Sequence, residues 1–456
     1  MKGDGVDQLR DQMAQTLGAD HVLAGDACQR YTIDGVTPAL VAKPGDVEGV
    51  SRALTLASRS KATVVPWGGG TRMALGYPPR GVDLVLSVER LQRILAYDAA
   101  DLTVTLEAGC TLDQASQALA TRGQMLPLDP PWPTRATIGG TLATGQTGLR
   151  RSLYGGPRDL LLGVRAVDAL GVITRAGGRV VKNVTGYDMN KLYLGSLGTL
   201  GVVVEASFKL VPVPEHEETV VGVCAAPARA LAVAERWVAL PVRPASVCAV
   251  TAAGLPALAL RGTAAEDVLV AARFAGPPAA VQRAVREARA LAHDMGGDQT
   301  TPFEGPAHTD IWAAMASLPS TAHLAHDEAL LKVSVLPSEL ATVLETATTV
   351  AGEHGLRLTW LADAGAGVLF LQVRTTDEPT LNVEAASAAL GPGLRALQGM
   401  LAHRWRNAVV HGCPPALKAD LPLWGADPPG IDVMRAIKRQ FDPAGTLNPG
   451  RFVGGL

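Results

Sequence analysis

Short apolar runs alternate with segments of helical period between residues 39 and 214. Asp46 can cap a helix in which apolar side chains recur every three or four positions over residues 47–57. Thr111 and Gln114 stand at the spacing of a capping box, which marks the start of a second helix. Helices and short strands joined by short connections predict α+β or α/β structure.

Strands are predicted where aliphatic and β-branched residues cluster between turn residues. Residues 161–177, LLGVRAVDALGVITRAG, form a predicted hairpin that turns at DALG. Residues 201–214, GVVVEASFKLVPVP, form a strand that two prolines bring to an end. We expect two further strands at DLVLSV and LTVTLEAG.

The pattern changes between Glu215 and about Leu423, where alanine-rich helices separate hydrophobic strands. The order is roughly βαββα occurring twice, which is typical of ferredoxin-like units, with a poorly defined join at 298–328. No sequence repeat supports a duplication. We expect strands at TVVGVCA, RPASVCAV, ALALRG, DVLVAARFAG, LLKVSVL, LRLTWLA and GVLFLQVR, and helices at 227–240, 277–295, 338–355 and 383–403.

A short helix and a turn-rich tail, FDPAGTLNPGRF, complete the chain from residue 431. These changes of pattern predict boundaries that give a first domain at 1–214, a second at 215–424 and a tail at 425–456 that returns to the first domain. A length of 456 residues with 47% hydrophobic and 18% charged residues is in keeping with a globular chain of two or three domains.

Charge and cysteine usage narrow the class of protein. The 41 basic and 43 acidic residues give a net charge of −2, which favours neither nucleic acid nor anionic lipid as a partner. The five cysteines have no CxxC spacing, which argues against iron-sulfur clusters, structural zinc and a disulfide framework. No apolar run approaches the roughly 18 residues of a membrane span. We expect a cytoplasmic protein that reaches the inner face of a membrane only through a partner.

A run of three glycines in VVPWGGGTRMALG, residues 64–76, is the first candidate for ligand chemistry. It matches neither GxxxxGK[ST] nor GxGxxG, because Met73 falls where the third glycine of the latter would stand. Its backbone N–H groups, together with Thr71 and Arg72, can hold a diphosphate, while a purely structural turn is the alternative.

Two further glycine clusters favour a ligand. ATIGGTLATGQTG spans residues 136–148, and GSLGTLG spans residues 195–201. Glycines spaced in this way let the backbone lie flat against a planar ring. Three clusters, one suited to a diphosphate and two to a flat ring, predict a dinucleotide with an aromatic system, namely FAD.

These clusters, with RRSLYGGPRDLLLGV and FDPAGTLNPGRF, closely resemble the vanillyl-alcohol oxidase type of FAD-binding family. The resemblance covers about 39–214 and the last 25 residues or so, and it is weak between them. It implies an α+β fold, a two-subdomain FAD-binding domain with an α+β, ferredoxin-like cap domain. Within it, VVKNVTGYDMNKLYLGSLGTLGV is similar to the FAD-binding subunits of bacterial glycolate oxidases.

The resemblance also implies which residues contact FAD. The first loop would hold the diphosphate, and the two later clusters would line the flavin and the adenosine. Thr71 stands where relatives that tether the flavin commonly place a histidine, so we expect the FAD to be non-covalent. The residues implied are Gly68, Gly69, Gly70, Thr71, Arg72 and Met73 in the first loop, then Thr137, Gly139, Gly140, Thr144, Gly145, Gly201 and Val202.

The stretch KNVTGYD, which precedes the third cluster, has two readings. Lys182 or Tyr187 near the flavin can stabilise the anionic reduced ring. Alternatively, Lys182 and Asp188 form an ion pair on a solvated turn.

Substrate residues are harder to assign. Oxidation of a 2-hydroxy acid needs a cation for the carboxylate and a base for the hydroxyl proton. The related catalytic subunits carry HGDGNxH, and this chain has no such block. In HRWRNAVVHG, Arg404 and Arg406 can hold a carboxylate if the segment is extended, and His411 is either a base or a structural residue. HLAH at 323–326 lacks a third well-spaced ligand, so we expect no metal site.

The resemblance therefore implies the FAD-binding subunit of a glycolate-oxidase-like complex. Its partners would be a larger flavin-containing catalytic subunit and an iron-sulfur subunit, and its substrate a small 2-hydroxy acid. A self-sufficient FAD-dependent 2-hydroxy-acid dehydrogenase and a non-redox FAD-binding scaffold are the alternatives.

Overall fold

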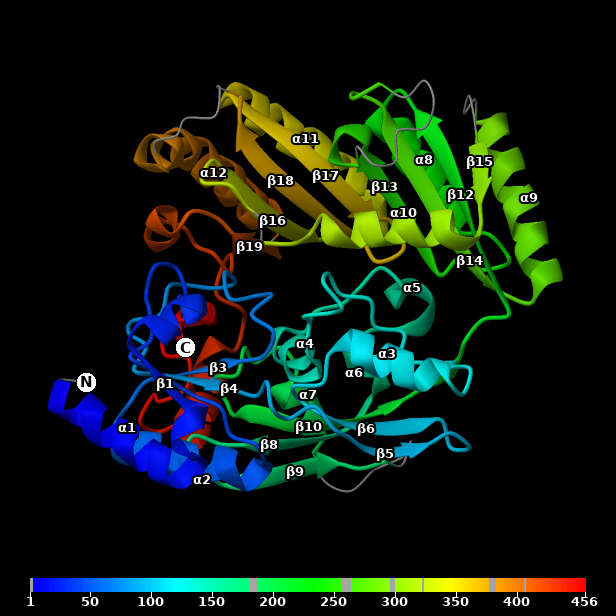
Figure 1. The fold of residues 1–456 in the computed structure, drawn as a ribbon. Helices are drawn as coiled ribbons and strands as arrows, with labels where there is room; N and C mark the ends of the chain where they lie inside the picture. The colour runs from blue at the N-terminus through cyan, green and yellow to red at the C-terminus, as the bar shows by residue number, and fades with distance from the viewer. Residues whose placement is uncertain are drawn as a thin grey trace. The chain divides into compact units, whose positions relative to one another are not determined.

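Figure 1 shows the computed structural model of the chain, which divides into two units. The first unit comprises Met1–Thr147, Gly156–Val213 and Asp427–Leu456, and the second comprises Gly148–Gly155 and Pro214–Ala426. None of the helices within the described ranges is long and apolar enough to cross a membrane. The structure describes residues 3–179, 187–255, 264–295, 300–321, 324–376, 383–405 and 407–456.

Residues 148–155 are assigned to the second unit, although their place in the sequence had put them in the predicted domain 1–214. Leu149 is buried in the hydrophobic core of the second unit. Arg150 forms an ion pair with Glu217, which belongs to the same unit. Contacts distant in the sequence therefore decide where this short segment belongs.

A small sheet leads into the first glycine loop. Its strands lie in the order β1-β2-β4-β3, with β2, β4 and β3 parallel and β1 antiparallel to β2. The predicted cap is present, because the Asp46 carboxylate accepts a hydrogen bond from the Gly49 N–H at 2.6 Å. The elements are α1 (Gly3–Leu17), β1 (Val22–Ala24), β2 (Leu40–Ala42), α2 (Val47–Arg59), β3 (Val64–Trp67) and β4 (Leu84–Ser87).

An antiparallel sheet of five strands, in the order β5-β6-β10-β8-β9, forms the rest of the first unit's framework. The predicted hairpin is confirmed, since β8 pairs with β9 around the DALG turn. The capping box of Thr111 and Gln114 is also confirmed at the start of α3. The strands are β5 (Ile94–Asp98), β6 (Thr103–Glu107), β8 (Leu161–Val167), β9 (Ile173–Gly177) and β10 (Val202–Lys209), and β7 (Gln124–Met125) pairs separately with β11 (Val211–Pro212).

Short helices connect these strands and carry the later glycine clusters. They are α3 (Leu112–Ala120), α4 (Ile138–Thr144), α6 (Pro157–Leu160) and α7 (Asn190–Tyr193), while α5 (Arg151–Tyr154) belongs to the second unit. One continuous hydrophobic cluster runs through the first unit, from Leu9 in α1 to Leu447 in the tail.

The second unit contains one sheet of eight strands, in the order β15-β12-β14-β13-β17-β18-β16-β19. Each half has the βαββαβ order and strand arrangement of a ferredoxin-like unit, and β13 and β17 join the halves. The strands are β12 (His216–Cys224), β13 (Ser246–Thr251), β14 (Val268–Gly276), β15 (Thr300–Phe303), β16 (Glu328–Ser334), β17 (Leu356–Asp363), β18 (Val368–Thr375) and β19 (Ala408–Gly412).

The pattern of residues had predicted four strands for the first half, ALALRG among them, and three for the second, and it missed β15 and β19. The ill-defined join at 298–328 contains β15 and a further helix, and HRWRNAVVHG contains β19. The strand expected at ALALRG lies outside the described residues. The long helices are α8 (Pro227–Val238), α9 (Pro278–Asp294), α10 (Gly305–Ser317), α11 (Leu340–Glu353) and α12 (Val383–Trp405).

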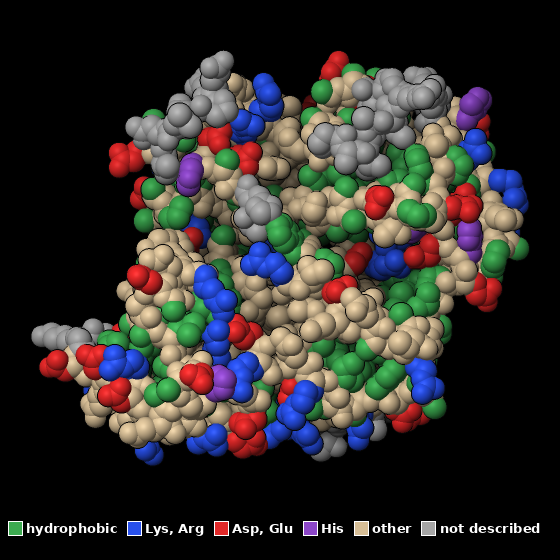
Figure 2. All heavy atoms as spheres, viewed as in Figure 1, with side chains coloured by type: hydrophobic (Ala, Val, Ile, Leu, Met, Phe, Trp, Pro, Cys, Tyr) green, Lys and Arg blue, Asp and Glu red, His purple; other side chains and the backbone are tan. Residues whose placement is uncertain are grey.

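Helices cover both faces of this sheet (Figure 1). Trp237 of α8 lies over Gly222 of β12, whereas the apolar residues of α10 pack with Val221 on the other face of the same strand. On the face of the molecule shown in Figure 2, Lys and Arg side chains are interspersed with Asp and Glu.

The C-terminal tail returns to the first unit, where it follows α13 (Ile431–Phe441). Leu447 forms a parallel bridge with Val64 of β3, just before the glycine loop. Arg451 is 2% exposed, and its guanidinium donates hydrogen bonds to the carbonyl oxygens of Met73, Leu75 and Tyr77 at 2.5, 3.0 and 3.3 Å.

Two more tail residues reach the third glycine cluster. The Lys438 ammonium donates to the carbonyl oxygens of Thr199 and Leu447, both at 2.8 Å, and to the Asp442 carboxylate at 2.6 Å. The Asn448 amide donates to the Leu197 carbonyl at 2.5 Å. We call Lys438, Asn448 and Arg451 the tail clamp.

We predict that Arg451→Met destabilises the first unit by about 3 kcal/mol or more. The substitution leaves three carbonyl oxygens without their charged donor, and each hydrogen bond to a charged group is worth roughly 1.5–3 kcal/mol. Thermal unfolding of the purified protein measures the effect. Arg435→Met is the control, because Arg435 is only partly buried, with its side chain 39% exposed, and pairs with Asp432 of its own helix. Equal unfolding temperatures for the two variants would contradict the clamp.

Candidate functional site

The first glycine loop presents backbone donors that the protein itself does not use. Within the described ranges, the N–H groups of Gly68, Gly69, Gly70 and Thr71 donate no hydrogen bond to another residue. The Arg72 guanidinium lies in the same loop and donates to the side-chain oxygen of Gln146. Burial lowers the pKa of Arg72 to about 10, so that it still carries its charge at neutral pH. Successive free N–H groups beside a cation suit an anionic ligand.

Close packing explains two glycines of this loop without any ligand. A Cβ atom on Gly69 would lie 1.6 Å from the Arg135 carbonyl oxygen, and one on Gly68 would lie 2.2 Å from Thr137 Oγ1. The first loop therefore rests directly on the segment that begins the second glycine cluster. Gly69 is required by the backbone of Arg135 and Gly68 by the side chain of Thr137, in addition to any requirement of a ligand.

The second and third glycine clusters lie against one another. Gly145 ends α4 in a left-handed conformation, with φ 62°. The Gly195 N–H donates to the Leu142 carbonyl at 2.8 Å, and the Leu197 N–H donates to the Ala143 carbonyl at 2.7 Å. Because Asn448 binds Leu197 and the same tail binds the first loop, all three clusters are held together in the first unit.

Several of the implied ligand residues also have local structural roles. Thr137 caps α4 by accepting from the Gly140 N–H at 3.2 Å. The Thr144 hydroxyl donates to the Gly140 carbonyl at 2.8 Å. Gly201 is buried, and Val202 is the first residue of β10. The remaining implied residues, Gly139 and Met73, lie in α4 and in the first loop.

Of the two candidate carboxylate-binding arginines, Arg404 lies in a helix and not in an extended segment. The predicted carboxylate site required an extended segment, but α12 remains helical through Trp405. Arg404 is exposed, and its guanidinium lies 4.6 Å from the centre of the Trp405 ring. Arg406 lies outside the described residues. His411 is buried on β19 with its ring edge-on to Phe370, at 6.1 Å between ring centres.

The residues before the third cluster are described only in part. Lys182 and Asn183 lie outside the described residues, as does His323 of the HLAH segment. Tyr187 is 94% exposed. The Asp188 carboxylate, one alternative partner for Lys182, lies 3.4 Å from the Lys191 ammonium and forms an ion pair with it.

The second unit contains a cluster of polar side chains that the sequence analysis did not find. Arg150 binds both oxygens of the Glu217 carboxylate, at 2.6 and 3.0 Å. His308 Nε2 lies 3.6 Å from the same carboxylate, and His308 Nδ1 lies 2.8 Å from the Thr219 hydroxyl. We call Arg150, Glu217, Thr219 and His308 the cap polar cluster.

Aromatic and cationic groups surround this cluster. The Trp312 indole donates to the Thr219 hydroxyl at 2.7 Å, and the Arg273 guanidinium stacks 4.2 Å from the Trp312 ring centre. Burial works to raise the pKa of the Glu217 carboxyl, but contacts with His308, Arg150 and Arg273 hold that pKa well below its usual range. Two guanidinium groups beside one carboxylate leave this place electropositive, which suits an anionic group.

One signal in the sequence could have revealed the cluster. Strand β12, HEETVVGVC, begins with four polar residues, HEET, before its apolar residues. Side chains of a strand alternate between its two faces, so Glu217 and Thr219 share one face and His216 and Glu218 share the other. Arg150 and His308 lie too far away in the sequence for any local pattern to connect them with Glu217.

We predict that Glu217→Gln destabilises the second unit by roughly 2–4 kcal/mol at neutral pH. This is towards the lower end of the cost of breaking a buried ion pair, because the side chain is 23% exposed. Since the folded pKa is depressed, the contribution of Glu217 is complete above about pH 5 and disappears as the pH falls through the folded pKa. The loss caused by the substitution should therefore shrink in acid.

Thermal unfolding of wild type and variant from pH 4 to pH 8 measures this difference. Glu215→Gln is the matched control, because Glu215 is an exposed neighbour two positions away. A constant difference between Glu217→Gln and wild type at every pH would show that ionisation of Glu217 does not stabilise the fold.

Comparisons with known proteins agree with this architecture. The family model "FAD binding domain" matches residues 38–177, and "FAD linked oxidases, C-terminal domain" matches residues 214–452. The fold is that of p-cresol methylhydroxylase with substrate bound, at a TM-score of 0.79 and 16% identity, covering 99% of this chain and 97% of that one. The predicted vanillyl-alcohol-oxidase-type α+β fold is confirmed.

Two relatives carry printed names of glycolate oxidase subunits. The chain is 30% identical to glycolate oxidase subunit GlcD of Bacillus subtilis (strain 168), covering 97% of this chain and 96% of the relative. It is 39% identical to glycolate oxidase subunit GlcE of Escherichia coli (strain K12), but over only 37% of this chain and 47% of the relative. The chain thus belongs to the FAD-linked oxidases, and it is an FAD-binding oxidoreductase.

Proposed function

We propose that the chain is a flavin-binding subunit of a glycolate-oxidase-like complex that oxidises a 2-hydroxy acid to a 2-oxo acid. The observation that carries the proposal is the end-to-end similarity to GlcD, combined with the lack of an HGDGNxH block in this sequence. The match to GlcE over 37% of this chain supports the same assignment. The partners would be a larger flavin-containing catalytic subunit and an iron-sulfur subunit.

FAD fits the free donors of the first loop. Its diphosphate would accept hydrogen bonds from the N–H groups of residues 68–71, and Arg72 would supply a positive charge beside it. Two clusters of small residues, held against each other by the contacts of α4, would lie along the flavin and the adenosine. When bound, FAD supplies the acceptor for the hydride that the substrate loses from C2. Thr71 provides no group for a covalent tether, so we infer that the FAD is non-covalent.

A self-sufficient 2-hydroxy-acid dehydrogenase is the second candidate, and the cap polar cluster favours it. Arg150 and Arg273 are cations in a largely buried environment, and such cations can hold a substrate carboxylate. His308 is a poor candidate for the base, because both of its ring nitrogens already face Thr219 and Glu217. His411 remains a weak candidate. The non-redox scaffold has no observation in its favour.

We predict that Gly69→Ala abolishes FAD binding while leaving the second unit folded. The new methyl group would lie 1.6 Å from the Arg135 carbonyl oxygen, so the loop must move away from its donors' present positions. Gly81→Ala is the matched control, because nothing lies within 4 Å of a Cβ at that position.

The ratio of flavin absorbance to protein measures occupancy, and chromatography of the cofactor released by acid identifies it. We expect FAD in the supernatant from wild type and from Gly81→Ala. Release of FMN, a flavin that stays with the precipitated protein, or full occupancy in Gly69→Ala would contradict the proposed site.

We also predict that the purified chain binds FAD but reduces an artificial dye with glycolate or D-lactate negligibly. A missing general base costs on the order of 10²- to 10⁴-fold in rate. Activity should appear when the catalytic and iron-sulfur subunits are co-expressed, and His411→Ala should then matter little. Brisk turnover by the single chain, lost in His411→Ala, would instead establish the self-sufficient dehydrogenase.

A further inference from the structure

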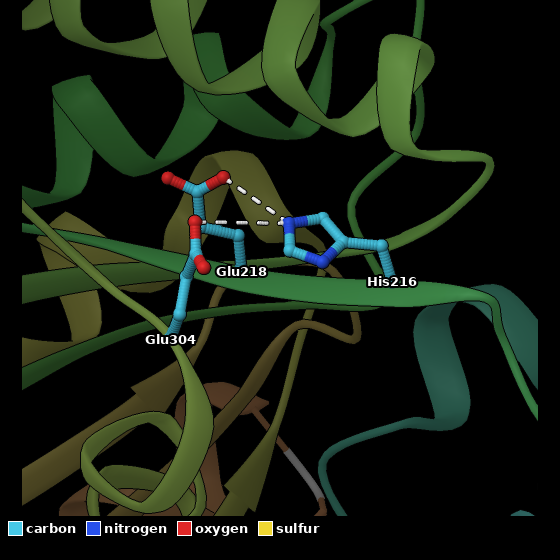
Figure 3. Close-up of side chains that lie close together, drawn as sticks. All are labelled: His216, Glu218 and Glu304. Carbon is cyan, nitrogen blue, oxygen red and sulfur yellow. Dashed lines mark ion pairs between the residues drawn. The ribbon is translucent and has the colours of Figure 1, made fainter.

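Three ionisable side chains meet at one end of β12, on the face of the strand opposite to Glu217 and Thr219. Figure 3 shows His216, Glu218 and Glu304 pointing toward one another. His216 Nε2 lies 3.6 Å from a Glu218 oxygen and 3.8 Å from a Glu304 oxygen. One ligand atom from each of the three residues lies within 4.8 Å of the other two.

Strand geometry places these residues together. His216 and Glu218 are two positions apart on β12, so their side chains leave the same face of the sheet. The β12–β15 ladder ends with Thr219 paired to Phe303, so the next residues along the two strands, Glu218 and Glu304, lie beyond its last pair and next to each other. The Glu304 backbone is extended, with φ −128° and ψ 170°, immediately before α10 begins. Two carboxylates next to each other repel unless a cation lies between them.

The two distances from His216 Nε2 are close to those between neighbouring ligands of a metal ion. Both distances are roughly half an ångström longer than the 2.7–3.2 Å that is typical of a hydrogen bond to nitrogen. Ligand atoms about 2.1 Å from a tetrahedral ion are about 3.4 Å from each other. Small side-chain adjustments would bring all three atoms onto one ion.

Burial of Glu218 is the second observation that points to a cation. This residue is 6% exposed, and its carboxylate is directed into the cluster. Among the residues that the structure describes, none donates a hydrogen bond to the Glu218 carboxylate, and its ion contact is with His216. His216 Nε2 is likewise buried and has no hydrogen-bond partner. A buried carboxylate without donors is costly unless a charge compensates it.

We propose that His216, Glu218 and Glu304 bind a divalent transition-metal ion such as Zn²⁺, which the sequence analysis did not expect. One imidazole and two carboxylates are ligands that suit Zn²⁺, and three protein ligands leave a position for water. Glu304 is 62% exposed on its side chain, so the ion can enter from solvent past this residue.

The ion would link β12 to Glu304, the residue immediately before α10. His308 lies four residues after Glu304, one turn into α10, and contacts Glu217 and Thr219 of β12. Fixing the start of α10 on β12 therefore also fixes the cap polar cluster. This role does not depend on the identity of the substrate or on the flavin.

Isothermal titration with Zn²⁺ tests the site, using the holoprotein after treatment with a chelator and removal of that chelator. We expect wild type to bind one equivalent more than Glu304→Gln and Glu218→Gln, or to bind it at least roughly 10-fold more tightly. Glu215→Gln is the matched control and should bind as wild type does. Zn²⁺ should also raise the unfolding temperature of wild type and of Glu215→Gln, but not that of Glu304→Gln.

Glu304→Gln is the decisive variant, because Glu304 makes no side-chain capping bond to α10 and its loss should not prevent folding. Equal stoichiometry and affinity in wild type and Glu304→Gln would overturn the proposal. Failure of wild type to bind Zn²⁺ at millimolar concentration would also overturn it, and would identify the cluster as an ion pair of protonated His216 with two carboxylates.

Discussion

The tail clamp is the interaction on which the first and third glycine loops, the proposed FAD site, depend. A loop of three glycines has no side chains with which to hold its own shape, and glycine loses more conformational freedom on folding than any other residue. Arg451, from the C-terminal tail, stabilises the residues that follow these glycines. Its guanidinium donates to the carbonyl oxygens of Met73, Leu75 and Tyr77. Lys438 and Asn448 stabilise the third cluster in the same way.

The tail clamp requires the removal of two cations, Arg451 and Lys438, from water. Burial lowers the pKa of Arg451 to about 10 and also lowers the pKa of Lys438, for which Asp442 provides a compensating charge. The carbonyl oxygens that these cations bind would otherwise be buried without donors. The same residues therefore satisfy the tail and hold the loops that we propose to bind FAD.

Strand β12 organises the second unit in a comparable way. Its first residues are polar on both faces, with Glu217 and Thr219 on one face and His216 and Glu218 on the other. Each face binds partners from distant parts of the chain, namely Arg150 and α10 for the first and Glu304 for the second. The strand therefore connects the helix that carries His308 with the short segment that follows the second glycine cluster.

The sequence by itself determined the local elements and the class of ligand. Period and capping predicted α2 and α3, because a cap such as Asp46 acts on N–H groups only two or three residues away. The spacing of the glycines predicted a loop that can bind a diphosphate, because the absence of side chains can be seen in the local sequence. The three clusters together predicted FAD, and the resemblance to the vanillyl-alcohol oxidase type agreed with that prediction. Only the tertiary structure decided which distant residues act together, because Arg451 with Met73, Arg150 with Glu217, and Glu304 with His216 are each brought together by the fold. It also showed that Arg404 lies in the last turn of α12, which continues to Trp405.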